Sequence, residues 1–407
     1  MAELPLEGAL VIELGSFYAA PAACAYLADL GARVVKIEGV ADGDPMRYGQ
    51  RWAGGPVPTT EGMSVIFSDC NRGKQSVALD IRVEPGRAAL KRLLAQADVF
   101  VTNMRQGTLR RYGLWYDDVR DLNEGLIYAH ISGFGPEGPH RDERAFDMSA
   151  QARSGLMNVL GHGGDPFTFH LAVDQLTANS TAWAVTAALL TRARTGKGTL
   201  VSASLLGSAL DFLRIPLTTS WAGERNIVLP SRAEATMPTL TSYRCSDERW
   251  IALSVGIASD KFWPMLCAVI GRPELGSDER YDDSQKRAEH RHEVIEILDR
   301  AFARRTAEEW LADLRAAGFP AAIVAEPLAV RDDVQARANF IVPAEGGYET
   351  VAPPMLFGGE PAGSARRAPE HGADTVAVLT GIGGLTADDL RSLEQAAAIP
   401  AAVQESQ

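Results

Sequence analysis

The sequence has few cysteines and lacks the short motifs that mark common metal, nucleotide and hydrolase sites. Only four of its 407 residues are cysteine, and no two of them form a C-x-x-C pair. We therefore expect neither a zinc site nor a disulfide framework, and we predict no bound metal. The sequence also contains no G-x-x-x-x-G-K-[ST] loop and no G-x-S-x-G elbow, which argues against P-loop nucleotide hydrolysis and serine hydrolase chemistry.

Long apolar runs and an excess of positive charge are also missing. No run approaches the roughly 18 apolar residues that span a bilayer, and the first residues do not have the pattern of a signal peptide. The formal net charge is −12, so broad binding to nucleic acid or to an anionic membrane is not expected. We predict a cytoplasmic protein that binds neither nucleic acid nor membrane.

Short β-branched segments alternate with helical patterns over the first 200 residues. The expected strands span 9–14, 34–38, 76–81, 99–103, 126–132 and 200–205. Helical segments between strands are typical of crossover connections, so the sequence predicts an α/β fold with a mainly parallel sheet. Only one glycine, Gly15, follows the first strand, whereas a dinucleotide fingerprint needs three, and a nicotinamide site is therefore not expected.

The middle of the chain has a different character. Beyond residue 220 the sequence predicts strands at 240–243 and 250–255 and helices at 261–270, 292–303 and 307–317. This pattern indicates a second, smaller α+β domain, in line with the two domains that this length favours. A segment rich in Pro and Gly then leads to helices at 373–380 and 386–397, which indicates a tail that returns to the first domain or wraps a partner.

Asp174 stands at the head of a long helical run that Gly196 and Gly198 close. Its position predicts an N-capping residue, because a side-chain oxygen there accepts from free amides of the first turn. A second interpretation is a nucleophile for a thioester carbonyl, held as an anion by the helix dipole. Spacing does not choose between them.

Basic residues gather near the predicted strand ends. They include Arg47, Arg72, Lys74, Arg105 and Arg111. Ligands of open α/β sheets bind beyond the carboxyl ends of the strands, so this grouping indicates an anionic ligand. Solvated surface charge is the simpler explanation for any one of these residues.

Nine segments together resemble a known protein family, and this resemblance distinguishes between the interpretations left open above. They read LEGALVIELGSFYAAPAACAYLADLGARVVKIE, GDPMR, NRGKQSVALDI, ADVFVTNMRQGTLRRYGL, IYAHISGFGPEGP, FDMSAQARSGLMNVLG, VDQLTAN, TRARTGKG and RRAPEHGADTVAVL. In this order the chain resembles the class III CoA-transferases (CaiB/BaiF type), a superfamily with formyl-CoA, carnitine and benzylsuccinate CoA-transferases and α-methylacyl-CoA racemase. The similarity runs from about Leu6 to Leu393.

The resemblance implies a particular domain organisation. A large Rossmann-like domain is expected from both chain ends, residues 1–205 and 326–407, and a small α+β domain from 220–325, with 206–219 as a linker. It also implies two subunits interlocked like links of a chain, as a homodimer or as a heteromer with a related subunit.

The resemblance further implies site residues. Asp174 matches the family's catalytic aspartate, and Tyr18, Ala19 and Pro21 fall on a loop that approaches CoA or the acyl group. Together with the basic residues at the strand ends and the candidates for an acyl pocket, the predicted binding residues are Tyr18, Ala19, Pro21, Arg47, Arg72, Lys74, Leu79, Asn103, Met104, Arg105, Arg111, Arg144, Phe146 and His170.

Two positions depart from relatives of the family. Gly39 stands where some members carry an arginine, which weakens the case for an adenine or phosphate contact there. Phe146 stands where the racemases carry a histidine base, which argues against racemisation.

The resemblance implies transfer of CoA from an acyl-CoA donor to a carboxylic acid. CoA and acyl-CoA are then substrates and not permanently bound cofactors. We expect acyl-aspartyl anhydrides and an aspartyl-CoA thioester on Asp174, with amides of the helix that it begins as oxyanion donors. Succinyl-CoA is a candidate donor. An acyl-CoA racemase or isomerase and a non-catalytic CoA-binding subunit remain as alternatives.

Overall fold

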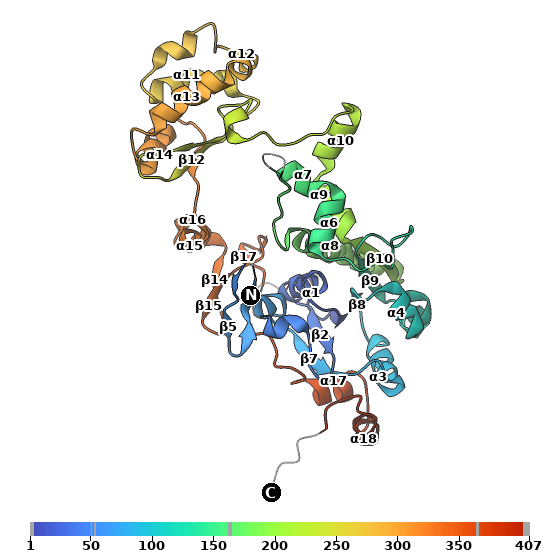
Figure 1. Cartoon of the computed structure of the whole chain (residues 1–407). Coiled ribbons are helices and arrows are strands. Elements are labelled where there is room, and N and C mark those ends of the chain that lie inside the picture. The colour runs from blue at the N-terminus through green and yellow to red at the C-terminus, as the bar shows by residue number, and fades with distance from the viewer. Residues whose placement is uncertain (1–3, 50, 53, 162–164, 364–365, 402–407) are drawn as a thin grey trace. The chain divides into compact units, whose positions relative to one another are not determined.

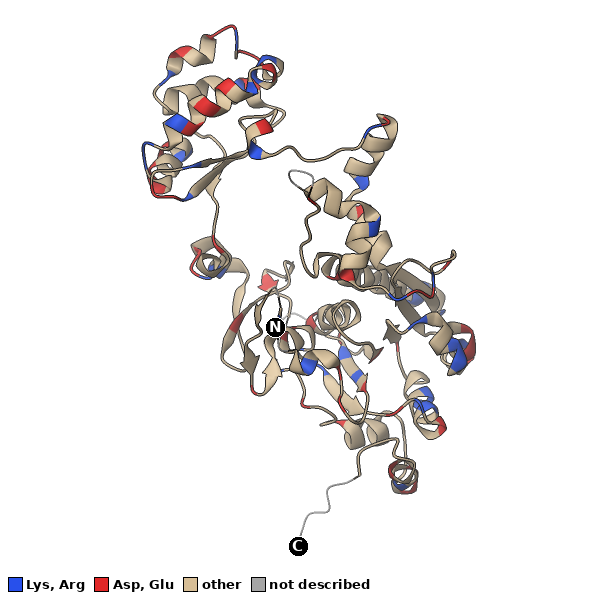
Figure 2. Cartoon of the chain, in the orientation of Figure 1, with Lys and Arg blue, Asp and Glu red and all other residues tan. Residues whose placement is uncertain are grey.

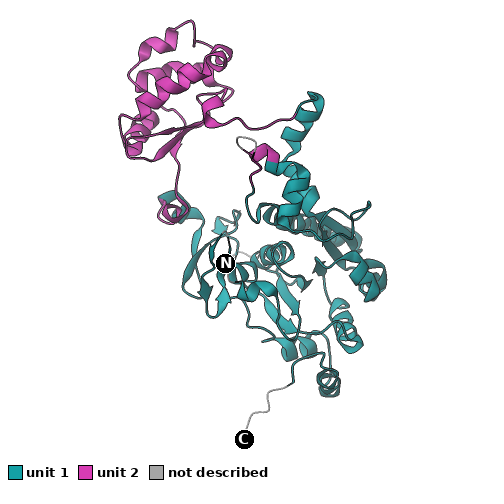
Figure 3. Ribbon diagram, viewed as in Figure 1, with its two compact units in different colours: residues 1–157, 168–225, 334–407 teal, residues 158–167, 226–333 magenta. Residues whose placement is uncertain are grey.

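The chain folds into two compact units. The computed structural model describes residues 4–49, 51–52, 54–161, 165–363 and 366–401. Unit 1 comprises residues 1–157, 168–225 and 334–407, and unit 2 comprises residues 158–167 and 226–333 (Figures 1 and 3).

Unit 1 is built on a six-stranded parallel sheet. Its strands are β1 (Leu10–Leu14), β2 (Arg33–Glu38), β7 (Gln75–Ala78), β8 (Val99–Thr102), β9 (Ile127–Ser132) and β10 (Thr199–Ser204). Their order in the sheet is β10-β9-β8-β1-β2-β7, with every pairing parallel. Numbered along the chain, the order is 3-2-1-4-5-6, the doubly wound Rossmann arrangement. The predicted α/β fold with a mainly parallel sheet is confirmed.

Helices connect and cover these strands. They are α1 (Ala19–Asp29), α2 (Val65–Cys70), α3 (Glu84–Leu94), α4 (Gln106–Arg111), α5 (Tyr116–Val119), α6 (Asp147–Ser154), α8 (Ala172–Thr195), α9 (Leu205–Phe212) and α10 (Arg214–Ala222). Helix α7 (Leu156–Leu160) begins in unit 1 and ends in unit 2. The prediction that residues 206–219 form a linker is therefore wrong, because they belong to helices α9 and α10 of unit 1. The apolar run LLGSALDF packs as a helix on α6 and α8.

The C-terminal segment returns to the sheet of unit 1. Helices α17 (Thr375–Gly381) and α18 (Ala387–Gln395) place Val378 and Leu393 in the same core as Ile12 and Phe100. The Asp374 carboxylate accepts from the backbone N–H of Ser76 at 2.9 Å, next to the outer strand β7. Backbone pairing and apolar burial together hold the tail on this domain.

Short elements complete unit 1. They are η1 (Pro45–Tyr48), η2 (Arg120–Leu122), α16 (Val334–Asn339) and the hairpin strands β3 (Arg51–Trp52), β4 (Gly55–Pro56), β5 (Thr59–Thr60), β6 (Met63–Ser64), β14 (Ile341–Ala344), β15 (Tyr348–Val351), β16 (Leu356–Phe357) and β17 (Glu360–Pro361). The Thr60 hydroxyl donates to the carbonyl of Gly346 at 2.8 Å and so joins the two hairpin regions.

Unit 2 is an antiparallel sheet with helices. Strands β11 (Ser242–Arg244), β12 (Trp250–Leu253) and β13 (Ala321–Ile323) pair in that order, and the helical elements are η3 (Arg232–Glu234), α11 (Ser259–Val269), η4 (Pro273–Ser277), α12 (Ser284–Glu289), α13 (Arg291–Phe302), α14 (Ala307–Ala316) and α15 (Pro327–Val330). Trp263, Tyr243 and Phe302 are fully buried in its core. Acidic and basic side chains intersperse along its helices, as in the pair Glu296–Arg300 on α13 (Figure 2).

The part of the chain that the structure describes holds no helix both long and apolar enough to cross a membrane.

Candidate active site

The site lies where the strand order of the sheet reverses. Strands β1 and β8 are neighbours there, and their connections leave in opposite directions. The Asn103 side chain joins the two strand ends, because its Nδ2 donates to the Ser16 carbonyl at 2.8 Å and its Oδ1 accepts from the Ser16 N–H at 3.1 Å. This is the place where open α/β sheets bind ligands.

A cavity of about 460 Å³ opens beside this bridge. Asp174 lines it, and so do eight of the predicted binding residues: Tyr18, Ala19, Asn103, Met104, Arg105, Arg111, Arg144 and Phe146. A second cavity of about 390 Å³ is lined by Leu79 and Gly39, and it shares Ser16 and Met104 with the first. Side chains predicted from distant parts of the sequence thus meet at one edge of the sheet.

Asp174 is not an N-cap, and the expectation that it caps its helix is wrong. Helix α8 begins at Ala172, so Asp174 is its third residue, and Leu171 at the N-cap provides no capping side chain. Asp147 caps the helix instead, because its Oδ1 accepts from the N–H groups of Val173 at 2.8 Å and Asp174 at 3.1 Å. The Asp174 carboxylate makes no hydrogen bond or ion pair with any residue that the structure describes.

The environment of Asp174 favours its protonated form. Burial and the negative charge of Asp147 raise the pKa of Asp174 to about 7. The helix dipole therefore does not hold it as an anion with a low pKa, as the sequence had suggested, since desolvation outweighs that attraction. Near neutral pH the carboxylate is poorly solvated and about half ionised, which suits a nucleophile.

The first-turn amides of α8 are already occupied. Those of Leu171, Val173 and Asp174 donate to Asp147, and that of Ala172 donates to the carbonyl of Phe169. The expectation that they stabilise an oxyanion is therefore wrong for this structure. Helix α1 differs, because no hydrogen bond of the Ala19 and Ala20 amides is found among the described residues and Tyr18 gives no side-chain cap.

Three predicted anion-binding residues serve the interior instead. Lys74 Nζ donates to Glu13 Oε2 at 2.6 Å, and Arg72 pairs with Asp29. Arg47 is 1% exposed and donates to Glu38. Their charges are neutralised by internal carboxylates, so none of the three lines either cavity.

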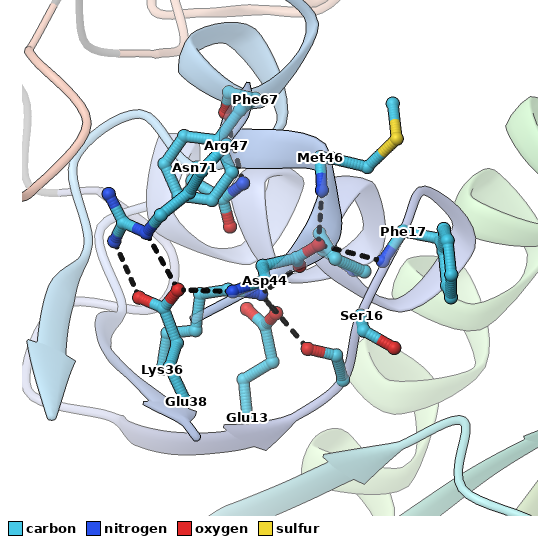
Figure 4. A network of polar contacts seen from close by, with 12 residues as sticks. Glu13, Ser16, Phe17, Lys36, Glu38, Asp44, Met46, Arg47, Phe67 and Asn71 are labelled. Atoms are coloured by element: carbon cyan, nitrogen blue, oxygen red, sulfur yellow. Dashed lines mark hydrogen bonds and ion pairs between the residues drawn. The ribbon is translucent and has the colours of Figure 1, made fainter. Parts of the chain in front are cut away.

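The pair of Arg47 with Glu38 belongs to a buried network of polar contacts (Figure 4), which Lys74 joins through Glu13, whereas Arg72 and Asp29 form a separate pair. Glu13 also binds Lys36 at 2.8 Å, and Lys36 contacts Asp44 at 2.9 Å. Burial would raise the pKa of Glu13, but Lys36 and Lys74 lower it, so the carboxylate is ionised.

The network reaches the wall of the cavity through Asp44. Its Oδ1 accepts from the N–H of Phe17 at 3.2 Å. Phe17 has a φ of 66°, an unusual left-handed conformation for a side chain of this size. Its ring packs edge to face on Phe146 with centroids 5.6 Å apart. The network therefore helps to shape the loop that carries Tyr18.

Two further predicted residues lie outside the cavities. Pro21 is buried in the first turn of α1, where its carbonyl accepts from Lys74 Nζ at 2.8 Å. His170 is exposed and precedes α8. The sequence did not identify His130, Arg141 and Glu143, which do line the cavity. The cluster RDER at 141–144 was a local signal for the last two.

A network of hydrogen bonds also lies beside Asp174. The Tyr18 hydroxyl donates to Gln175 Oε1 at 2.8 Å, and the Gln175 amide donates to the hydroxyl of Tyr26. Burial raises the pKa of Tyr18 above its ordinary range, and Asp174 adds to this rise. Tyr18 is therefore a neutral hydroxyl next to the candidate nucleophile.

Comparison with known proteins shows the family of the chain. A family model described as CoA-transferase family III matches residues 6–375. The chain is 35% identical to a (R)-2-hydroxy-4-methylpentanoate CoA-transferase of Clostridioides difficile, over 93% of this chain and 95% of that protein. It is 30% identical to a succinyl-CoA–D-citramalate CoA-transferase of Chloroflexus aurantiacus, over 96% and 97%.

The fold has a close counterpart among solved structures. A CaiB/BaiF family protein from Brucella suis superimposes with a TM-score of 0.82 at 28% identity, and the match covers 93% of this chain and 100% of that one. The similarity thus extends over both units and is not confined to the parallel sheet.

Proposed function

Because the chain belongs to CoA-transferase family III, we propose that it moves CoA from an acyl-CoA donor to a carboxylic acid through covalent intermediates on Asp174. The observation that supports this most directly is the Asp174 carboxylate, which is half-buried in the cavity at the sheet edge and has no hydrogen-bond partner among the described residues. A carboxylate stripped of water and freed from strong partners is a better nucleophile than one held in an ion pair.

The reaction balances without water or an external base. An Asp174 oxygen attacks the acyl carbon of the donor and the C–S bond breaks. CoA thiolate departs, and an acyl-aspartyl anhydride is formed. The thiolate attacks the aspartyl carbonyl, which releases the donor acid as a carboxylate and leaves an aspartyl-CoA thioester. The acceptor carboxylate then attacks the carbonyl of that thioester, the C–S bond breaks, and CoA thiolate departs from a second acyl-aspartyl anhydride. The thiolate attacks the acceptor acyl carbon of this anhydride, which forms the new acyl-CoA and releases the Asp174 carboxylate.

Each tetrahedral intermediate needs donors for its oxyanion. The amides at the start of α1 are suitable, because Ala19 lines the cavity and the helix dipole adds positive potential there. The N–H groups of Ala19 and Ala20 are thus the donors in this proposal, in place of those of α8.

The two adjoining cavities suit a CoA substrate that reaches across them. Arg105, Arg111 and Arg144 line the first cavity and Arg82 the second. These arginines are the candidates for phosphate contacts, since Arg47, Arg72 and Lys74 are engaged inside the protein.

The apolar residues that line the first cavity indicate the class of acid substrate. Phe17 and Phe146 give the cavity an apolar side next to its arginines. Such a surface suits a substituted or dicarboxylic acid, with succinyl-CoA as the proposed donor. A racemase would need a base where Phe146 stands, so racemisation is the weaker alternative, and the presence of Asp174 speaks against a non-catalytic subunit.

Mass spectrometry of the protein after exposure to acyl-CoA tests this proposal. We expect the peptide with Asp174 to gain the mass of CoA less water, and hydroxylamine to convert it into a hydroxamate. The panel contains several acyl-CoA donors, among them succinyl-CoA. Each donor is offered with glutarate and with branched and aryl 2-hydroxy acids as acceptors. Absence of both the adduct and any CoA exchange across the panel contradicts the proposal, whereas solvent deuterium entering the α-carbon supports a racemase.

We also propose that two copies of the chain assemble. Large apolar side chains of α8, α9 and α10 are more than half exposed in the single chain, among them Trp183, Phe212, Ile215 and Trp221. Such surfaces are rare on monomers. Light scattering after gel filtration is expected to give about 87 kDa, twice the 43.7 kDa chain. A chain that stays monomeric at micromolar concentration contradicts a homodimer.

A further inference from the structure

Asp147 is a buried carboxylate that the proposed reaction does not use. It is the first residue of α6 and only 6% exposed. Its Oδ1 accepts from Val173 and Asp174, and its Oδ2 accepts from the N–H of Leu171 at 3.0 Å and from Gln151 Nε2 at 2.5 Å. One side chain from another helix therefore satisfies three amides at the start of α8.

Gln151 extends this connection to the segment before α8. Its Nε2 also donates to the Phe169 carbonyl at 2.8 Å, and its Oε1 accepts from the Thr168 hydroxyl at 3.0 Å and the Phe169 N–H at 3.2 Å. The chain then enters α8 through Leu171, whose φ of 67° is unusual for a branched residue. Asp147 and Gln151 thus hold the entry to the helix in one conformation.

A structural cap would not need this arrangement. A serine or asparagine at position 171 could accept from the amide of Val173 or Asp174 without any charge. The protein instead buries a second carboxylate within hydrogen-bond distance of the backbone of its nucleophile, and that carboxylate disfavours the ionisation of Asp174. The unfavourable burial of this second carboxylate is explained if its charge and its position both serve Asp174.

We propose that Asp147 is a positioning residue for Asp174: it fixes the first turn of α8 through backbone N–H groups and places a second negative charge beside the nucleophile. This inference rests on the proposed transferase function. Asp174 must project from a rigid turn, because a displacement of about 1 Å costs roughly a hundredfold in rate. The neighbouring charge also keeps Asp174 basic enough to attack a thioester near neutral pH.

Other titratable or charged groups share the cavity. They are Tyr18 from the loop before α1, Arg105 and Arg111 at α4, His130 on β9, and Arg141, Glu143 and Arg144 after β9. Apart from burial, only Asp147 shifts the pKa of Asp174. Glu143 pairs with His140 at 2.6 Å, and burial lowers the pKa of His130, which contacts the Met104 carbonyl. Asp147 is therefore the group to change.

The test is the pH dependence of kcat and kcat/KM in Asp147→Asn. Asparagine keeps the shape, but its amide nitrogen turns a donor toward Leu171 N–H or Gln151 Nε2. We expect kcat to fall about 10- to 100-fold with little change in KM. The wild-type kcat/KM should rise with pH through about 7 as Asp174 ionises, and this rise should move to lower pH by roughly half a unit to one unit in the variant.

Two other variants complete the experiment. Asp374→Asn is the matched control, because Asp374 also accepts from a backbone N–H and an amide, Ser76 and Gln75, but lies outside both cavities. It should keep the wild-type profile. Gln151→Met removes the tie to Thr168 and Phe169 without a change of charge, so kcat should fall and the profile should not move.

The outcomes separate this inference from the proposed function. An Asp147→Asn protein with wild-type kcat and an unmoved profile overturns the inference. If that variant does not fold, wild-type kcat in Gln151→Met overturns it. If the wild type exchanges no CoA, the proposed function fails. The influence of Asp147 on Asp174 can then be tested by carboxyl ¹³C NMR, with the Asp174 signal assigned by its loss in Asp174→Asn. An equal titration midpoint of Asp174 in the wild type and in Asp147→Asn overturns the role of the charge.

Discussion

Replacing Asp174 by asparagine is expected to lower the rate of CoA exchange by at least about a thousandfold, because the covalent intermediates of the proposed reaction form on this carboxylate. Alanine should have the same effect. The CoA adduct should disappear from the peptide with Asp174, whereas binding of CoA, measured by calorimetry, should change little. Residual exchange within tenfold of wild type would contradict the nucleophilic role.

The same substitution should stabilise the fold. The pKa of Asp174 is about 7 in the folded chain, above its ordinary value. The folded state therefore binds the proton more tightly, and stability falls as pH rises from about 4 to 7. At pH 8, Asp174→Asn should melt at a higher temperature than the wild type, with no difference near pH 4. Asp211→Asn, at an exposed residue of α9, serves as the control.

Replacing Glu13 by glutamine is expected to give the largest loss of stability, about 3–5 kcal/mol. Glu13 is fully buried and accepts from Lys36 Nζ at 2.8 Å and Lys74 Nζ at 2.6 Å. Without the charge of Glu13, Lys36 keeps its ion pair with Asp44, whereas Lys74 keeps the neutral oxygens of Asn71 and Pro21. Calorimetry should show a melting temperature lower by several degrees.

Two comparisons make this prediction specific. Asp278→Asn breaks a pair with Arg280 at the surface and should lower the melting temperature far less, because solvent screens the pair. The double variant Glu13→Gln with Lys74→Met should recover part of the loss, since one uncompensated ammonium is gone. A Glu13→Gln protein that melts like the wild type would show that the network is not ionised as described.

Asp174 and Asp147 illustrate what a linear pattern can and cannot reveal. The first carboxylate was recognised as important, but its position before an apolar run predicted a cap. The actual cap comes from 27 residues earlier in the chain, and a contact between two helices leaves no local trace in sequence. The raised pKa of Asp174 comes first from burial and then from the charge of that same neighbour.

The basic residues make the same point. Arg72 and Lys74 follow one another closely before β7 and were grouped with Arg105 and Arg111 as anion-binding candidates. Only the folded chain separates them, because Asp29 and Glu13 lie opposite the first two, whereas Arg105 and Arg111 face a cavity. Charge along a sequence does not show which charges are neutralised inside.

The alternation of β-branched runs with helical segments was enough to determine the parallel sheet, since central strands such as β1 and β8 are buried on both faces and their apolar runs are therefore nearly continuous. The ordered motifs were enough to identify the family. Which carboxylate caps α8, which amides stay free and which basic groups reach the cavity were decided only in the tertiary structure. These are properties of side chains that meet across long separations, and they depend on packing and desolvation, which no local pattern encodes.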